Sequence, residues 1–91
     1  MNTIAALESA ALNASAAFAQ CDLLDAEAKA RTAAEAFRNL AAAFRSAGQL
    51  ADADNAEAIA EGAEHSAEML ATSPRIAEAR RMRAALASLP R

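Results

Sequence analysis

The residues best suited to chemistry lie in the stretch EAIAEGAEHSAEML, residues 57–70, where the chain's single histidine stands among four glutamates. On a helix, Glu61 and Glu68 would flank His65, at four residues before it and three after it. Carboxylate-bridged metal sites in helical bundles use Glu-x-x-His pairs from two helices, with further glutamates pointing inward. This chain has one histidine and no second motif of that kind. The sequence therefore predicts no metal site, and we expect His65 to be a surface residue.

Other chemical motifs are incomplete. The stretch from Asp52 begins Asp-x-Asp like a calcium loop, but Ala56 and Glu57 stand where a third ligand and the turn glycine belong. Cys21 is the only cysteine, so it forms no internal disulfide, and we expect it to act as a small buried hydrophobe. The sequence has no Gly-rich phosphate loop and no Ser/His/Asp or Cys/His set, so we expect no enzyme, no cofactor and no small-molecule substrate.

An acidic face is the clearest charged feature. Five carboxylates recur at three- and four-residue steps, without a base between them: Asp54, Glu57, Glu61, Glu64 and Glu68. Such neighbours on a helix repel each other by a few tenths of a kcal/mol per pair, so an opposite charge should offset them. Residues 49–73 carry six acids and no base, whereas residues 74–91 carry five arginines and one glutamate. Two interpretations stay open: a solvated face partly paired with the basic segment or a neighbouring subunit, and a docking surface for a basic partner.

A basic stripe precedes the acidic face. Arg31, Arg38 and Arg45 recur every seven residues, and Glu27 and Glu35 stand at pairing distance from the first two on a helix. The net charge of the chain is −3, and it has no Tyr or Trp for base stacking, so the sequence predicts no direct nucleic-acid binding. We expect the stripe to flank a helix–helix contact, where it could meet the acidic face.

The composition predicts the elements that position these residues. Alanine supplies 31 of the 91 residues, Val is absent, and there are only two Gly and two Pro, so nearly the whole chain should be helical. We expect an all-α fold, a small alanine-rich bundle of three to four helices with a long central antiparallel hairpin. The expected single domain spans residues 1–91, with helices at about 3–20, 22–47, 51–71 and 74–89.

Apolar spacing predicts which faces are buried. The apolar seam expected of the second helix consists of Leu23, Ala26, Ala30, Ala33, Phe37, Leu40, Phe44 and Ala47. The first helix carries one charge, Glu8, so it should be buried on more than one side, within one chain or at a dimer contact. In the third helix, Ile59 and Leu70 should point inward, and the small residues around Gly62 should allow a second helix to approach. The seam expected of the fourth helix consists of Ile76, Ala79, Met82, Leu86 and Leu89. Larger apolar residues are few, so the core is thin and self-association would supplement it.

Local signals predict the helix ends. Asp22 can cap the start of the second helix, and Gly48 is the expected left-handed stop at its end. Ser73 followed by Pro74 is a typical start for the fourth helix.

Residues 34–60 resemble a single tetratricopeptide repeat, a helix-turn-helix unit with characteristic aromatic, small and glycine positions. Those positions are filled here by Phe37, Leu40, Ala41, Phe44, Gly48, Ala53 and Ala60. The resemblance implies a packed helical hairpin and the family's habit of binding peptides and partner proteins.

These observations predict a non-catalytic protein–protein interaction module, a helical adaptor or assembly subunit that forms a homodimer or joins a larger complex. The alternative is a small acidic inhibitor or nucleic-acid mimic, which would present the acidic face to a basic surface of a nucleic-acid-processing protein. No uncharged apolar stretch reaches about 18 residues, so no membrane span is expected. Without a basic N-terminal region to indicate a secretion signal, we expect a cytoplasmic protein, and the preference for Arg over Lys fits a bacterial or phage source.

Overall fold

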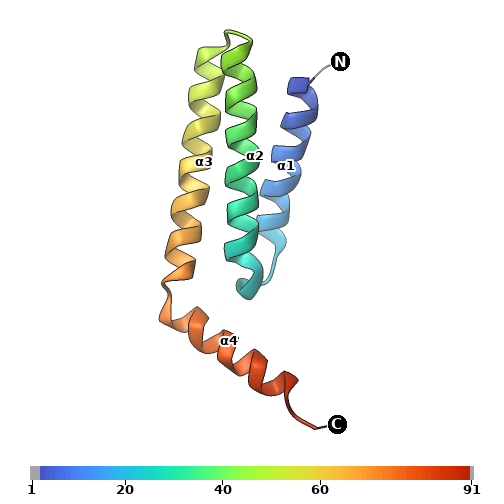
Figure 1. Cartoon of the computed structure of the whole chain (residues 1–91), viewed down its shortest axis with the longest axis vertical. Helices are drawn as coiled ribbons and strands as arrows, with labels where there is room; N and C mark the ends of the chain where they lie inside the picture. The colour runs from blue at the N-terminus through green and yellow to red at the C-terminus, as the bar shows by residue number, and fades with distance from the viewer. Residues whose placement is uncertain (1–2, 91) are drawn as a thin grey trace.

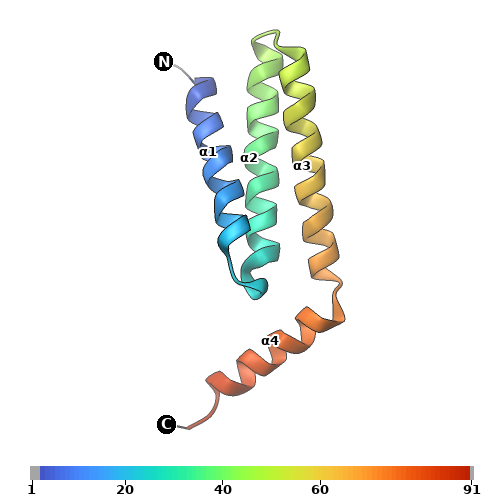
Figure 2. The same ribbon diagram turned by 180° about the vertical axis from the view of Figure 1, so that it is seen from behind.

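The computed structural model describes residues 3–90, and its secondary structure in that range is entirely helical. The elements are α1 (Thr3–Gln20), the short 3-10 helix η1 (Leu23–Asp25), α2 (Ala26–Ser46), α3 (Leu50–Ala71) and α4 (Pro74–Ala87). α2 lies between α1 and α3, and α2 and α3 form a long antiparallel hairpin (Figures 1 and 2). The predicted all-α bundle with a central hairpin is therefore confirmed.

α4 does not join the bundle lengthwise. It leaves the end of α3 at a sharp elbow and crosses beyond the lower ends of α2 and α1 (Figure 1). The molecule measures 57 × 25 × 15 Å, and its radius of gyration is 16.5 Å. A compact chain of this length would have a radius of gyration of about 12 Å, so the fold is extended.

The core consists mainly of alanine. Ten of the fourteen buried apolar residues are alanines, and the other four are Phe37, Leu40, Phe44 and Ile76. Alanine removes little side-chain entropy on folding and lets helix backbones approach closely, but each methyl group contributes little buried apolar area. The main cluster joins the α2 seam to Ala53, Ala56 and Ala60 of α3 and to Ala11 of α1.

Two of the predicted helix ends are confirmed in detail. Gly48 has a φ of 78°, its N–H donates to Arg45 O at 3.1 Å, and Gln49 N donates to Phe44 O at 2.9 Å. These two bonds form a Schellman motif, which satisfies the last carbonyls of α2. At the start of α4, Ser73 Oγ accepts a hydrogen bond from Ile76 N at 3.5 Å, with Pro74 at the first helical position.

The start of α2 differs from the prediction. The regular helix begins at Ala26 rather than Asp22, because residues 23–25 form a 3-10 turn. Asp22 makes no side-chain capping hydrogen bond, although Asp25 N donates to Asp22 O at 3.0 Å. Leu23, which the periodicity placed on the α2 seam, is 57% exposed as a result.

Burial on α1 and α3 is narrower than expected. On α1 only Ala11 is fully buried, because this helix rests mainly on α2. On α3, Ile59 is 51% exposed, and a Cβ built at Gly62 meets no atom within 4 Å. The predictions that α1 is buried on several sides and that a second helix covers the Gly62 side of α3 are therefore wrong for this chain alone.

The predicted seam of α4 is also wrong beyond its first turn. Ile76 is buried and Ala79 is half-buried, but Met82, Leu86 and Leu89 are all more than 60% exposed. The elbow after α3 turns α4 away from the bundle (Figure 1), which leaves these apolar residues exposed.

Candidate interaction surface

The basic stripe of α2 meets the acidic face of α3. Arg38 forms a two-pronged ion pair with Glu64, in which Nη1 donates to Oε1 at 2.8 Å and Nη2 donates to Oε2. Arg38 Nε also lies 3.7 Å from Glu57 Oε1. The planar guanidinium group suits such a paired contact with a carboxylate. The prediction that Arg38 pairs with Glu35 is wrong, since its ion pairs are with α3.

Arg45 extends this contact toward the turn. Its Nη1 lies 3.3 Å from Glu57 Oε2, and its Nη2 lies 3.8 Å from Asp54 Oδ1. Glu57 therefore stands between Arg38 and Arg45. Three of the five carboxylates of the acidic face, Asp54, Glu57 and Glu64, are paired with arginines inside the chain.

These pairs shift the proton affinities of their members. The hydrogen bonds from Arg38 hold the pKa of Glu64 below its usual value, and the same contact raises the pKa of Arg38. The side chains are about 40% exposed, so solvent screens the attraction. The ion pairs between α2 and α3 consequently contribute more to the register of the hairpin than to the stability of the fold.

The rest of the acidic face is open. Glu61 and Glu68 are exposed and form no ion pair with any other residue in the range 3–90. His65 is exposed beside them, and no group of His, Cys, Asp or Glu in the described chain is arranged to hold a metal ion. Cys21 is half-buried, and its thiol donates to Phe18 O at 3.1 Å.

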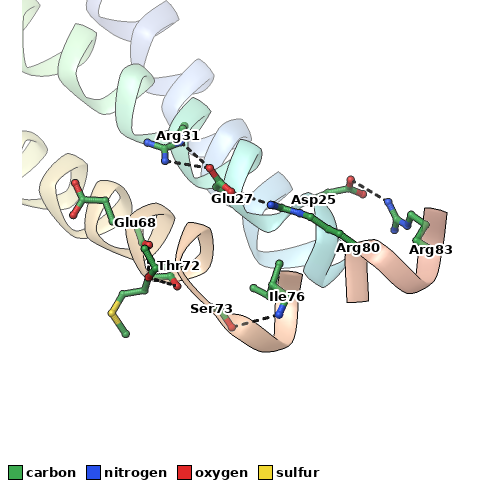
Figure 3. A network of polar contacts seen from close by, with 10 residues as sticks. Asp25, Glu27, Arg31, Glu68, Thr72, Ser73, Ile76, Arg80 and Arg83 are labelled. Carbon is green, nitrogen blue, oxygen red and sulfur yellow. Dashed lines mark hydrogen bonds and ion pairs between the residues drawn. The ribbon is translucent and has the colours of Figure 1, made fainter. Parts of the chain in front are cut away.

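A second polar network attaches α4 to the start of α2. Glu27 accepts hydrogen bonds from Arg31 Nη2 at 3.1 Å, as predicted, and from Arg80 Nη2 at 3.0 Å (Figure 3). These two bonds, that from Arg80 above all, lower the pKa of Glu27. Arg83 Nη1 lies 4.0 Å from Asp25 Oδ1, so two arginines of α4 hold it against the acidic N-terminal end of α2.

An apolar groove opens where α3 turns into α4, and we call it the elbow groove. Its volume is about 790 Å³, and its lining residues come from η1, the end of α3, the connection after it and the first turns of α4: Leu23, Met69, Leu70, Thr72, Ser73, Pro74, Arg75, Ile76 and Ala79. Leu23 and Met69 are 57% and 62% exposed. Only Arg75 among these residues carries a charge, so the groove is a mainly apolar concave surface.

The groove continues onto α4. Ala79 lines it, and Met82 and Leu86 follow at three- and four-residue spacing, which places them on the same side of the helix. Met82 is 61% exposed, Leu86 66% and Leu89 61%. We call Met82 and Leu86, together with Leu89 just beyond the end of the helix, the α4 apolar face. Together with the elbow groove it contains five of the eight large apolar side chains that the structure exposes.

The periodicity of the sequence identified Met82, Leu86 and Leu89 as one apolar face but predicted that this face is buried. Their spacing on α4 is that of any buried helical face, and no local signal distinguishes a face covered within the chain from one left open. The elbow after Ala71, where α3 ends, leaves them uncovered by any other described part of the chain.

Comparison of the chain with protein-family models, with curated proteins and with solved structures gave no match. The tetratricopeptide-repeat resemblance of residues 34–60 therefore stays a prediction, although Phe37, Leu40, Phe44, Ala53 and the other apolar residues that carry it all belong to the main core cluster. No helix in the described range is both long enough and apolar enough to cross a membrane.

Proposed function

We propose that this chain is a non-catalytic protein–protein interaction module, a helical adaptor or assembly subunit. The observation that supports this function is the continuous apolar surface formed by the elbow groove and the α4 apolar face. Exposed apolar patches with charged margins are typical of interaction sites on proteins. The margins here include Arg75 on α4 and Glu68 on α3, neither of which forms an ion pair within residues 3–90.

The chemistry of the surface favours a helical partner. An amphipathic helix binds a groove through apolar residues at three- and four-residue spacing. Met69 and Met82 have flexible, polarisable side chains that adapt to such a partner. Covering the exposed part of a Met82 or Leu86 side chain would contribute about 1 to 2 kcal/mol, so a few such contacts suffice for specific binding.

The alternative, an acidic inhibitor or nucleic-acid mimic, has less support. Arg38 and Arg45 partly neutralise three of the five carboxylates of the acidic face. Only Glu61 and Glu68 remain for a basic partner, and exposed charges such as these influence association rate more than affinity.

Affinity capture from an extract of the native host tests the proposal. Leu86→Lys adds a charge to the α4 apolar face, and Leu12→Lys is a matched control, because both leucines are 66% exposed and the second lies on α1. We expect the first variant to lose the captured partner and the second to retain it. Equal capture by both variants would contradict the proposal. Loss of capture only when Glu61 and Glu68 are changed to arginine would instead support the acidic inhibitor.

A further inference from the structure

We infer that the elbow groove and the α4 apolar face form a two-fold interface between two copies of this chain, in which the α4 of each copy lies against the elbow groove of the other. This inference rests on the proposed function, since it names the partner of the same surface. Four features of the structure support it: the excess exposed area, the thin core, the layout of the surface and the distribution of charge.

The exposed area is too large for a compact single chain. The accessible surface is 6232 Å², whereas a folded monomer of 9.4 kDa exposes about 5,000 Å². The difference is about 1,200 Å² per chain, and a standard stable interface buries about 800 Å² on each partner. One interface of ordinary size would therefore bring the exposed area of each chain close to that of a compact protein.

The core of one chain is correspondingly thin. No large side chain in residues 3–90 is fully buried, and even Phe37 and Phe44 remain 8% exposed. Small helical domains with little buried apolar area commonly gain stability from oligomerisation. A second copy would cover Met69, Met82 and Leu86, which are larger than most side chains of the present core.

The layout of the surface suits a symmetric contact. In a two-fold interface the same patch occurs on both partners, so it must contain both a projecting and a receiving part. Here α4 projects Met82 and Leu86, and the elbow groove beside them is concave. Ala79 belongs to the groove and lies one turn before Met82, so a small residue stands where two copies of α4 would cross most closely.

The charges of the two elements are complementary. Arg75 lines the elbow groove and Glu68 lies in the last turn of α3; both are exposed, and neither forms an ion pair in the described part of the chain. Placing α4 of one copy across the α3–α4 elbow of the other brings opposite charges together. Such peripheral pairs orient association and contribute little to affinity.

The mass of the full chain in solution tests the inference. Light scattering or sedimentation equilibrium over a wide concentration series should give twice the single-chain mass of 9.4 kDa. Leu86→Lys should raise the dissociation constant by about 100-fold or more, because a symmetric interface loses a central apolar contact twice. Leu12→Lys should leave it unchanged. Circular dichroism should show the same helicity in all three proteins, since both side chains are exposed.

Two results would overturn the inference. The first is a single-chain mass at every concentration. The second is a dimer that Leu86→Lys leaves intact; its dissociation with Ile59→Lys would then place the interface on α3. If the chain is monomeric while host-partner capture still depends on Leu86, self-association fails and the proposed function stands. If the chain is monomeric and no capture depends on Leu86, both fail.

Discussion

Replacing Gly62 by alanine should stabilise the protein. Gly62 lies inside α3, and a Cβ built there meets no atom within 4 Å. The substitution therefore introduces no steric conflict, and it removes the conformational freedom that glycine has in the unfolded chain. The same site tests an expectation from the sequence, because the small residues around Gly62 suggested a closely packed second helix.

The size of the effect follows from helix propensity. Glycine in a helix interior is less favourable than alanine by about 0.8 to 1.0 kcal/mol. The entropy of unfolding is about 2.1 cal/mol/K per residue, or about 0.19 kcal/mol/K for a chain of 91 residues. We therefore expect Gly62→Ala to raise the melting temperature by about 5 °C.

Gly48→Ala is the matched control with the opposite sign. A Cβ at Gly48 also meets nothing within 4 Å, so neither substitution causes a steric clash. The φ of Gly48 is +78°, however, and the left-handed conformation costs an alanine about 1 to 2 kcal/mol. We expect this variant to melt about 5 to 10 °C below the wild type.

Thermal unfolding followed by circular dichroism measures both variants. A rise for Gly62→Ala together with a fall for Gly48→Ala is the expected result. A lower melting temperature for Gly62→Ala would refute the reasoning, because it would show that another helix packs on that side of α3. A higher dissociation constant of the dimer for Gly62→Ala would also indicate that the second copy binds α3 rather than the elbow groove.

Three further perturbations test the core, the ion pairs and the attachment of α4. Because the folded-state pKa of Glu64 lies below the unfolded value of 4.5, its pairing stabilises the protein above that pH and is lost as the pH falls below about 4.5. Glu64→Gln should thus show a smaller drop in melting temperature on acidification than Glu61→Gln, and equal drops would contradict the pairing. Phe44→Ala should lower the free energy of unfolding, measured by urea denaturation, by about 3 kcal/mol or more. The control Leu12→Ala should lower it by less than about 1 kcal/mol. Similar values for the two variants would show that Phe44 is not a core residue. Ile76→Ala should speed hydrogen exchange in α4 while sparing α2 and α3, and a uniform change would show that α4 does not open separately.

Much of the secondary structure follows from the sequence, because its causes are local. The alanine content favours helix at almost every position, and Gly48, Ser73 and Pro74 end or start helices through bonds to neighbours a few residues away. The α2 seam was also predictable, since Phe37, Leu40 and Phe44 are the bulky apolar residues of this helix and lie on one side of it.

The sequence left open which side of each remaining helix is buried. Alanine is found on every side of α1, α3 and α4, so their apolar faces differ little in hydrophobicity and several packings have similar energy. Tertiary structure decided among them by placing α1 and α3 against α2 and leaving Ile59 and Leu86 in solvent.

The partners of the charged residues also required the tertiary structure. Arg38 has Glu35 one turn away, yet it pairs with Glu64, 26 residues later in the sequence, because the antiparallel hairpin places the acidic face of α3 beside it. Arg80 reaches Glu27 across 53 residues for a comparable reason, since the elbow brings α4 to the start of α2. The sequence by itself determined the helices and the chemical character of their faces. Which faces meet and which stay open was decided only by the fold, because those choices depend on contacts between residues distant in the chain.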